Sequence, residues 1–154
     1  MQVSTMTFVE DYMRQALAQA QVALQAGEVP VGAVVVREGR IIARAHNERE
    51  RLGDPTAHAE VLALRRAAQT VGDWRLEDCT MVVTLEPCPM CAGAIVQARL
   101  GQLFFGAYDM RYGCCGSVLA LPEDERLQGA CRVAGGFLEE ECAALMRTFM
   151  QDRR

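Results

Sequence analysis

The chain has 154 residues, of which 51% are hydrophobic and 23% charged, so we expect one ordinary domain over residues 1–154 with a core of its own. It has no run of 18 apolar residues and no basic-then-apolar leader at residues 1–7, which predicts a cytoplasmic protein without membrane association. Its net charge of −4, with all 16 cationic side chains being arginine, argues against strong nonspecific nucleic-acid binding but allows a small local site.

The N-terminal region is predicted to be helical. Apolar residues recur at helical spacing from Val9 to Leu24, Thr7 and Glu10 have the spacing of a capping box, and Gly27 is a plausible stop. Residues 30–37 have the composition of a buried strand. Glu38-Gly39 then indicates a turn before a returning strand at residues 40–45.

Helices and strands alternate through the rest of the chain. Their alternation predicts an α/β domain with helices on both faces of the sheet. The expected elements are helices at residues 57–68, 89–99 and 138–150, strands at residues 80–85 and 102–107, and a short strand near residues 131–134. The core face of the helix at 57–68 is expected to hold Val61, Leu62, Leu64 and Ala68.

The seven cysteines have irregular spacing, and their odd number argues against a disulfide framework. Cys88 and Cys91 are three residues apart, so in a helix they share one face. Pro89 suits the first helical position, which places Cys88 near the N-cap, where free N–H groups favour thiolates. We therefore expect these two cysteines to be metal ligands, and Cys79, Cys131 and Cys142 to be small core residues.

His58 and Glu60 are two residues apart, and in the middle of a helix they would point about 200° apart. Both can approach one metal ion only if the ion lies beyond the tip of the helix. Asp54-Pro55-Thr56 contains a capping residue and a proline just before them, which predicts that the helix begins close to His58.

One histidine and two cysteines leave the fourth position of a tetrahedral zinc site open, as in catalytic zinc sites. Zinc lowers the pKa of a bound water from about 15.7 towards about 7. Glu60 is then expected to be the catalytic residue that takes the water proton and delivers it to a departing nitrogen. A structural zinc site would instead need a fourth ligand, for which Cys79, Cys114 and Cys115 are the candidates.

The combination His58-Ala59-Glu60 and Pro87-Cys88-Pro89-Met90-Cys91 is the signature of zinc deaminases. From about Val9 to Met150 the chain resembles the bacterial tRNA adenosine deaminases of the cytidine-deaminase superfamily. The resemblance rests on the sequence words at residues 27–33, 45–47, 54–60, 74–76, 84–94, 105–107 and 141–145.

The resemblance implies a three-layer α/β/α cytidine-deaminase-like fold with a mixed five-stranded sheet, one zinc ion per subunit and a homodimer. It implies hydrolysis of the wobble adenosine in a tRNA anticodon loop to inosine. It also implies roles in substrate binding. Asn47 would bond the purine, the backbone of Ala59 would help orient it, Val29 and Pro30 would form pocket wall, and Asp109 would lie near the substrate loop.

Asn47 and Asp109 can also cap turns in their loops. Residues 127–133 stand where many family members carry Asn-His-Arg, and the basic tail of some members is missing, which predicts fewer contacts to RNA. The alternatives to tRNA deamination are deamination of a free base or nucleoside, such as guanine or cytosine, and a zinc-stabilised scaffold without activity.

Overall fold

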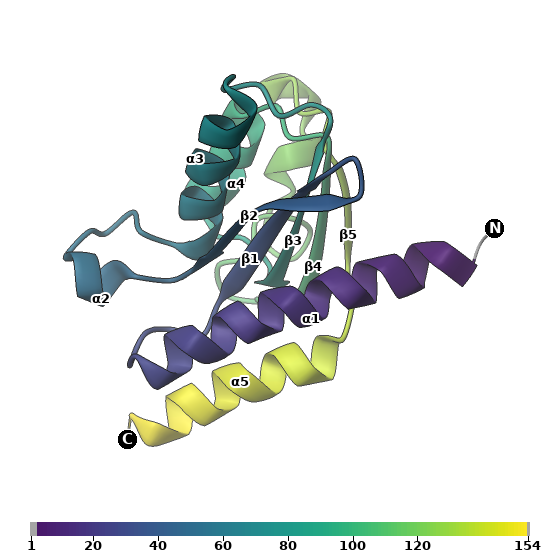
Figure 1. The fold of residues 1–154 in the computed structure, drawn as a ribbon. Coiled ribbons are helices and arrows are strands. Elements are labelled where there is room, and N and C mark those ends of the chain that lie inside the picture. Colours follow the sequence, from purple (N-terminus) through teal and green to yellow (C-terminus); the bar gives the residue numbers. More distant parts are fainter. Residues whose placement is uncertain (1–2, 154) are drawn as a thin grey trace.

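The computed structural model of the protein describes residues 3–153, with the backbone alone for residues 3–7. Its centre is a five-stranded sheet with the strand order β2-β1-β3-β4-β5 (Figure 1). The strands are β1 (Gly32–Arg37), β2 (Arg40–His46), β3 (Cys79–Leu85), β4 (Gln102–Ala107) and β5 (Arg132–Gly135).

The sheet is mixed. Strand β1 pairs in antiparallel fashion with both β2 and β3, whereas β3, β4 and β5 are parallel to one another. Because β1 alone runs in the opposite direction, the carboxyl ends of β2, β3 and β4 meet at one edge of the sheet. The loops that follow these three strands are therefore brought together, as at the ligand sites of open α/β sheets.

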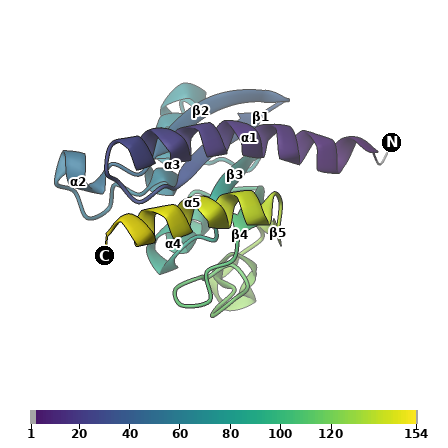
Figure 2. The ribbon, with the colours of Figure 1, turned by 90° about the horizontal axis from the view of Figure 1, so that it is seen from below.

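Helices cover both faces of the sheet. Helices α1 (Val3–Gln25) and α5 (Glu139–Asp152) lie side by side on one face, while α3 (Ala59–Val71) and α4 (Pro89–Gln97) lie on the other (Figures 1 and 2). Alternate strand residues enter two separate cores, as the period of two in a strand requires. Val34 and Val36 pack with the α1 and α5 residues, and Ala33 and Val35 pack with the α3 and α4 residues.

Helix α1 lies unusually close to β1 at Gly32. A Cβ atom at this position would lie 2.0 Å from the carbonyl oxygen of Ala16. Only a residue without a side chain allows this approach, which fixes the height of α1 above the sheet.

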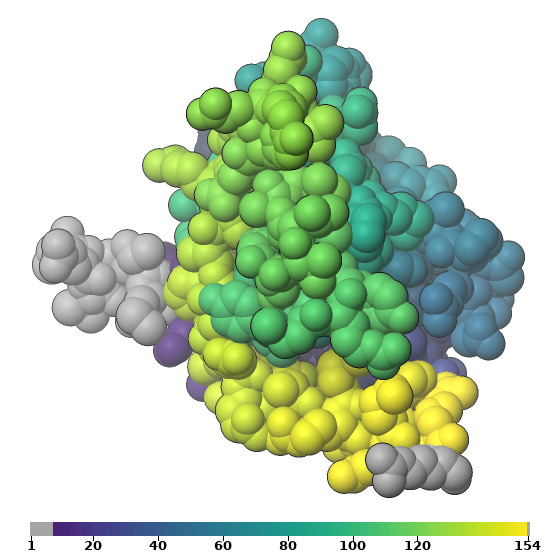
Figure 3. All heavy atoms as spheres, turned by 180° about the vertical axis from the view of Figure 1, so that it is seen from behind, coloured from purple at the N-terminus to yellow at the C-terminus, as the bar shows by residue number. Residues whose placement is uncertain are grey.

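A long connection joins β4 to β5 and forms much of the surface above the C-terminal helix in the view from behind (Figure 3). Within it lie two short 3₁₀ helices, η1 (Leu121–Glu123) and η2 (Glu125–Leu127). Its first half passes back over the carboxyl edge of the sheet, where the backbone N–H of Cys114 donates to the carbonyl of Pro87 at 2.9 Å. This return brings part of the connection to the site described below.

The predicted fold class is confirmed, and the differences in detail have local causes. Helix α1 already begins at Val3, so the prediction that Thr7 starts it was wrong. The short helix α2 (Arg49–Leu52) was not expected from the sequence, because it is a single turn that ends at Gly53 in the left-handed conformation. No helix in the described part of the chain combines the length and the apolarity needed to cross a membrane.

Candidate active site

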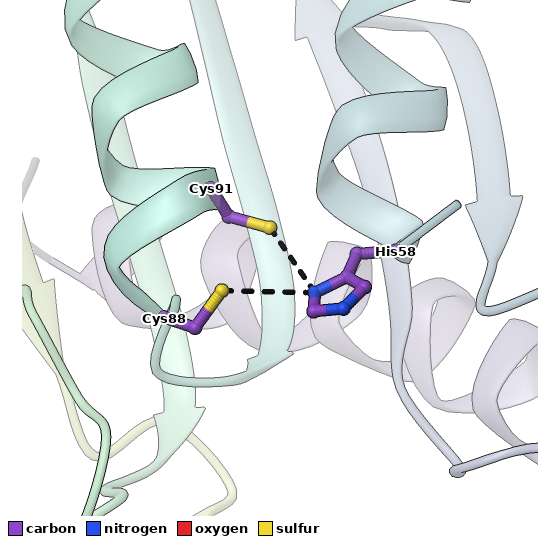
Figure 4. A group of neighbouring side chains, drawn as sticks. All are labelled: His58, Cys88 and Cys91. Carbon is purple, nitrogen blue, oxygen red and sulfur yellow. Dashed lines mark hydrogen bonds between the residues drawn. The ribbon is translucent and has the colours of Figure 1, made fainter. Parts of the chain in front are cut away.

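Two helices begin side by side at the carboxyl edge of the sheet, and each has a residue that could bind a metal ion at its N-cap. His58 is the N-cap residue of α3, and Cys88 is the N-cap residue of α4, with Pro89 at the first helical position. Cys91 follows in the first turn of α4 and is buried. The three side chains point toward one another across the gap between the helix tips (Figure 4).

The distances between the three side chains suit a shared metal ion. The Nδ1 atom of His58 lies 3.6 Å from the Sγ atom of Cys88 and 3.5 Å from that of Cys91. All three ligand atoms lie within 4.8 Å of one another, and no fourth His, Cys, Asp or Glu within residues 8–153 completes such a group. One imidazole and two thiols are a donor set that zinc prefers, and three ligands leave one tetrahedral position for a reactant.

The two cysteines have different proton affinities. The pKa of Cys88 is lowered to about 4, mainly because Cys91 donates a hydrogen bond to it, with a further contribution from His58. The pKa of Cys91 is raised by the same hydrogen bond and by burial. The pKa of His58 is raised by its hydrogen bond with Cys88. The cluster therefore already holds one thiolate, the form that binds metal.

Glu60 is the second residue of α3, and its side chain is buried, with 4% of its surface exposed. Burial raises its pKa from 4.5 to about 7. A carboxyl group with a pKa near neutrality exchanges protons readily in both directions, which is the property a general acid and base requires. Glu60 thus combines a suitable proton affinity with a place beside the His-Cys-Cys group.

A cavity of about 350 Å³ opens in front of this group. It is bounded by residues from the start of β1, the ends of β2, β3 and β4, the tips of α3 and α4, and one residue of α5. This volume is in the range of pockets for small ligands, and its lining combines apolar walls with a few polar groups. The lining residues are Val29, Val31, Asn47, Arg49, His58, Ala59, Glu60, Leu85, Glu86, Cys88, Asp109, Tyr112 and Met146.

Of the residues that the family resemblance assigned to substrate binding, Val29, Asn47, Ala59 and Asp109 line this cavity. Pro30 does not line it, because its side chain is fully buried, and the neighbouring Val31 contributes to the wall instead.

Asn47 and Asp109 also stabilise their own loops. The Oδ1 atom of Asn47 accepts from the backbone N–H of Arg49 at 3.1 Å. The Oδ1 atom of Asp109 accepts from the backbone N–H groups of Arg111 and Tyr112 at 3.0 and 3.1 Å. The loop-capping interpretation of both residues is therefore correct and coexists with a place in the cavity wall, because each side chain has a second polar atom.

Sequence reasoning missed several wall residues. Glu86 belongs to the conspicuous sequence word at residues 84–94, and its charge just before a metal ligand was a usable signal. Leu85, Arg49 and Tyr112 had no comparable signal. Leu85 is the last residue of β3, Arg49 is the first residue of the unexpected helix α2, and Tyr112 lies in the long β4–β5 connection. Met146 lies on α5, more than thirty residues after Tyr112, the next wall residue in the chain, and only the packing of α5 brings it there.

The sequence also resembles known proteins. The MafB19-like deaminase family matches residues 9–130, which is most of the chain and includes every member of the His-Cys-Cys group. Together with the fold and the geometry of the site, this match defines the class of protein: the chain is a deaminase with a cytidine-deaminase-like fold.

Individual relatives narrow the class. The tRNA-specific adenosine deaminase of Bacillus subtilis is 48% identical over 149 residues, which cover 97% of this chain and 92% of the relative. A solved structure from studies of A-to-I editing by tRNA:A34 deaminases is 41% identical with a TM-score of 0.84 and covers 88% of this chain and 98% of that one. The guanine deaminase of Bacillus subtilis is 42% identical with a TM-score of 0.62 over 64% of each chain. The chain belongs to the family of tRNA-specific adenosine deaminases.

Proposed function

We propose that the protein is a zinc-dependent hydrolase that converts the wobble adenosine, position 34 of a tRNA anticodon loop, to inosine. The observation that carries this proposal is the group of His58, Cys88 and Cys91 at two helix tips with buried Glu60 beside it. The similarity to tRNA-specific adenosine deaminases extends over nearly the whole chain and supports the choice of substrate.

The metal ion in this proposal is one zinc per chain, held by Nδ1 of His58 and the thiolates of Cys88 and Cys91. When bound, zinc supplies a Lewis acid that makes water acidic enough to act as a nucleophile at neutral pH. The chain supports this binding in two ways. The N-terminus of α4 stabilises negative charge on its cysteines, and the two cysteines come from one helical turn, so few torsions need to be fixed.

Glu60 moves the protons of the reaction. Hydrolytic deamination adds water at C6 of adenine and expels the amino group as ammonia, so one proton must leave the water and one must reach the departing nitrogen. A buried carboxyl group with a pKa of about 7 can perform both transfers in sequence. Its burial also keeps bulk water from competing for the proton.

The cavity walls orient the base. Val29 and Val31 offer an apolar surface for a flat ring, and the Asn47 amide offers polar groups to its edge. Arg49 lines the same cavity, is exposed, and forms no ion pair with any residue from 8 to 153. A cation at this place suits a substrate with phosphates, which a tRNA has and a free base lacks.

One paired assay tests the proposal. The zinc-loaded protein is incubated with a transcribed tRNA that carries A34, and in parallel with free adenosine, guanine and cytosine. We expect inosine in the tRNA and no turnover of the free compounds. The control is the same tRNA with G34, which should remain unchanged. Turnover of a free base together with an unchanged A34 tRNA would contradict the proposal.

Guanine is the strongest second candidate. The cavity volume of about 350 Å³ accommodates any purine, and the solved guanine deaminase is 42% identical over the part that aligns. That alignment leaves out about a third of this chain, whereas the tRNA deaminase structure covers 88% of it. The guanine arm of the paired assay decides between the two substrates.

We further propose that two copies form a homodimer. In support, an open groove between α3 and α4 is lined largely by apolar side chains, among them Val61, Leu64 and Trp74, and Trp74 is 52% exposed. Sedimentation analysis of the protein should give twice the mass of one chain, and Trp74→Asp should shift it towards the monomer.

We also propose a cytoplasmic location. All seven cysteines, each within the described part of the chain, are free thiols, which suits a reducing compartment.

A further inference from the structure

A second buried carboxylate lies close to the candidate active site and has no part in the mechanism given above. Glu86 follows β3, precedes the metal-ligating Cys88 by two residues, and has 2% of its surface exposed. Its backbone N–H donates to the carbonyl of Ala107 at the end of β4. A buried carboxylate is costly unless it is fully hydrogen-bonded, so its partners show what it stabilises.

The partners of Glu86 all belong to the first half of the β4–β5 connection. Oε1 accepts from the backbone N–H of Asp109 at 3.0 Å and from the hydroxyl group of Ser117. Oε2 accepts from the backbone N–H groups of Cys115 and Ser117 at 3.0 and 2.9 Å. One side chain thus holds both ends of the loop between Asp109 and Ser117.

The loop is wrapped tightly around this carboxylate. A Cβ atom at Gly113 would lie 2.3 Å from the Cδ atom of Glu86 and 2.4 Å from the carbonyl oxygen of Asp109. The backbone N–H of Cys114 donates to the carbonyl of Pro87, the residue between Glu86 and Cys88. The loop is therefore attached to the segment that carries a metal ligand.

This loop supplies one wall of the cavity through Asp109 and Tyr112. Asp109 in turn accepts from the backbone N–H of Tyr112 at 3.1 Å. A continuous series of bonds thus runs from the metal-ligand segment through Glu86 to Asp109 and on to Tyr112.

We propose that Glu86 is a positioning residue that fixes the substrate-facing loop, residues 109–117, at a set place relative to the metal ligands. Its role in substrate affinity rests on the proposed function, whereas its role as the anchor of the loop does not.

The substitution Glu86→Gln tests the proposal because its effect on the two ends of the loop differs. An amide nitrogen in place of Oε2 would face two backbone N–H donors, those of Cys115 and Ser117. In place of Oε1 it would face only one, that of Asp109, because the Ser117 hydroxyl can rotate and accept. Glutamine should therefore place its nitrogen on the Asp109 side and release that end alone.

The experiment compares the zinc-loaded wild type and Glu86→Gln by amide hydrogen exchange and by steady-state kinetics with the A34 tRNA. We expect the Asp109 amide to exchange faster while the amides of Cys115 and Ser117 remain protected. We expect KM to rise about 10- to 100-fold, the size typical for a lost bond to a charged group, with kcat and zinc content nearly unchanged.

Asp124→Asn is the matched control. The Asp124 carboxylate also accepts from a backbone N–H, that of Arg126 at 2.9 Å, in the same β4–β5 connection, but it does not line the cavity. This variant should leave KM unchanged. Ser117→Ala removes only the hydroxyl partner of Glu86, so it should raise KM less than Glu86→Gln does. It provides the measurement if Glu86→Gln fails to fold.

An unchanged exchange rate of the Asp109 amide in Glu86→Gln would contradict the proposal that Glu86 anchors the loop. Faster exchange of the Asp109 amide with an unchanged KM would contradict the proposed role of the anchored loop in substrate affinity. An unchanged KM in Ser117→Ala would contradict the same role. If the wild type deaminates a free base and leaves the tRNA unchanged, the proposed function fails. The same KM comparison is then made with that base, and the hydrogen-exchange result keeps its meaning.

Discussion

The seven cysteines fall into two groups whose comparison explains how this chain forms a group that could hold a metal ion. Cys88 and Cys91 lie in the first turn of α4 and face His58 across the gap to α3. The other five are buried inside the protein, and none of them belongs to the His-Cys-Cys group. They are Cys79, Cys114, Cys115, Cys131 and Cys142.

Environment, and not residue type, separates the two groups. Burial raises the pKa of Cys79 to about 11 and that of Cys142 to about 12, so these thiols stay protonated at neutral pH. Cys88 has a pKa of about 4 because Cys91 and His58 donate hydrogen bonds to it. A cysteine is suited to bind a metal ion here because it lies at a helix tip beside other side chains that could bind the same ion.

The largest effect is expected from removing a ligand. Cys88→Ala takes one of the three donors from the site and should lower zinc affinity more than about 100-fold, with loss of activity. Metal analysis after dialysis against a weak chelator measures this. The matched control is Cys114→Ala, which removes a buried thiol near Cys88 and should retain zinc. Loss of zinc from Cys114→Ala would mean that the buried cysteines also contribute to zinc binding.

Glu60→Gln should separate metal binding from catalysis. Zinc content should stay at one per chain because Glu60 lies outside the His-Cys-Cys group, while kcat should fall by about 10²–10⁴, the usual contribution of a general acid and base. Zinc analysis and inosine formation are measured on the same sample. Full activity in this variant, or loss of its zinc, would refute the role of Glu60.

Alkylation of the metal-free protein should distinguish the cysteines by the reactivity of their thiol groups. At pH 6 iodoacetamide should modify Cys88 before the other six, because Cys88 is a partly exposed thiolate and the others are buried thiols. Peptide mapping by mass spectrometry identifies the first modified residue. Zinc should protect Cys88, so equal labelling with and without zinc would contradict its assignment as a ligand.

Cys142→Ala should have the smallest effect and should act on stability alone. Cys142 packs against Gly106, where a Cβ atom would lie 2.3 Å from its Sγ atom, and it belongs to the core under α1 and α5. Losing the buried sulfur should lower the free energy of unfolding by about 1 kcal/mol. Denaturant unfolding measures this value. A lowered zinc content would contradict the prediction, because it would show that Cys142→Ala also disturbs the metal site.

Sequence reasoning succeeded where the signal is local. Pro89 at the first helical position and the i, i+3 spacing of the cysteines predicted the tip of α4 correctly, because an N-cap is decided by a few neighbouring residues. The condition that His58 lies at a helix tip was also met. The N-cap is His58 itself, whereas Asp54 accepts from the backbone N–H of Thr56 in the turn before it.

By itself, the sequence determined the α/β class, the two helix starts and the types of residue that could bind a metal ion. The tertiary structure decided which other residues join them. Because β1 alone is antiparallel, the ends of β2, β3 and β4 share one edge, and this brings Asn47, Glu86 and Asp109 to a single cavity. The tertiary structure also buried Pro30 outside the cavity wall and brought Met146 into that wall. Side chains distant in sequence meet only through the order and direction of strands and the packing of α5, and no local pattern encodes either.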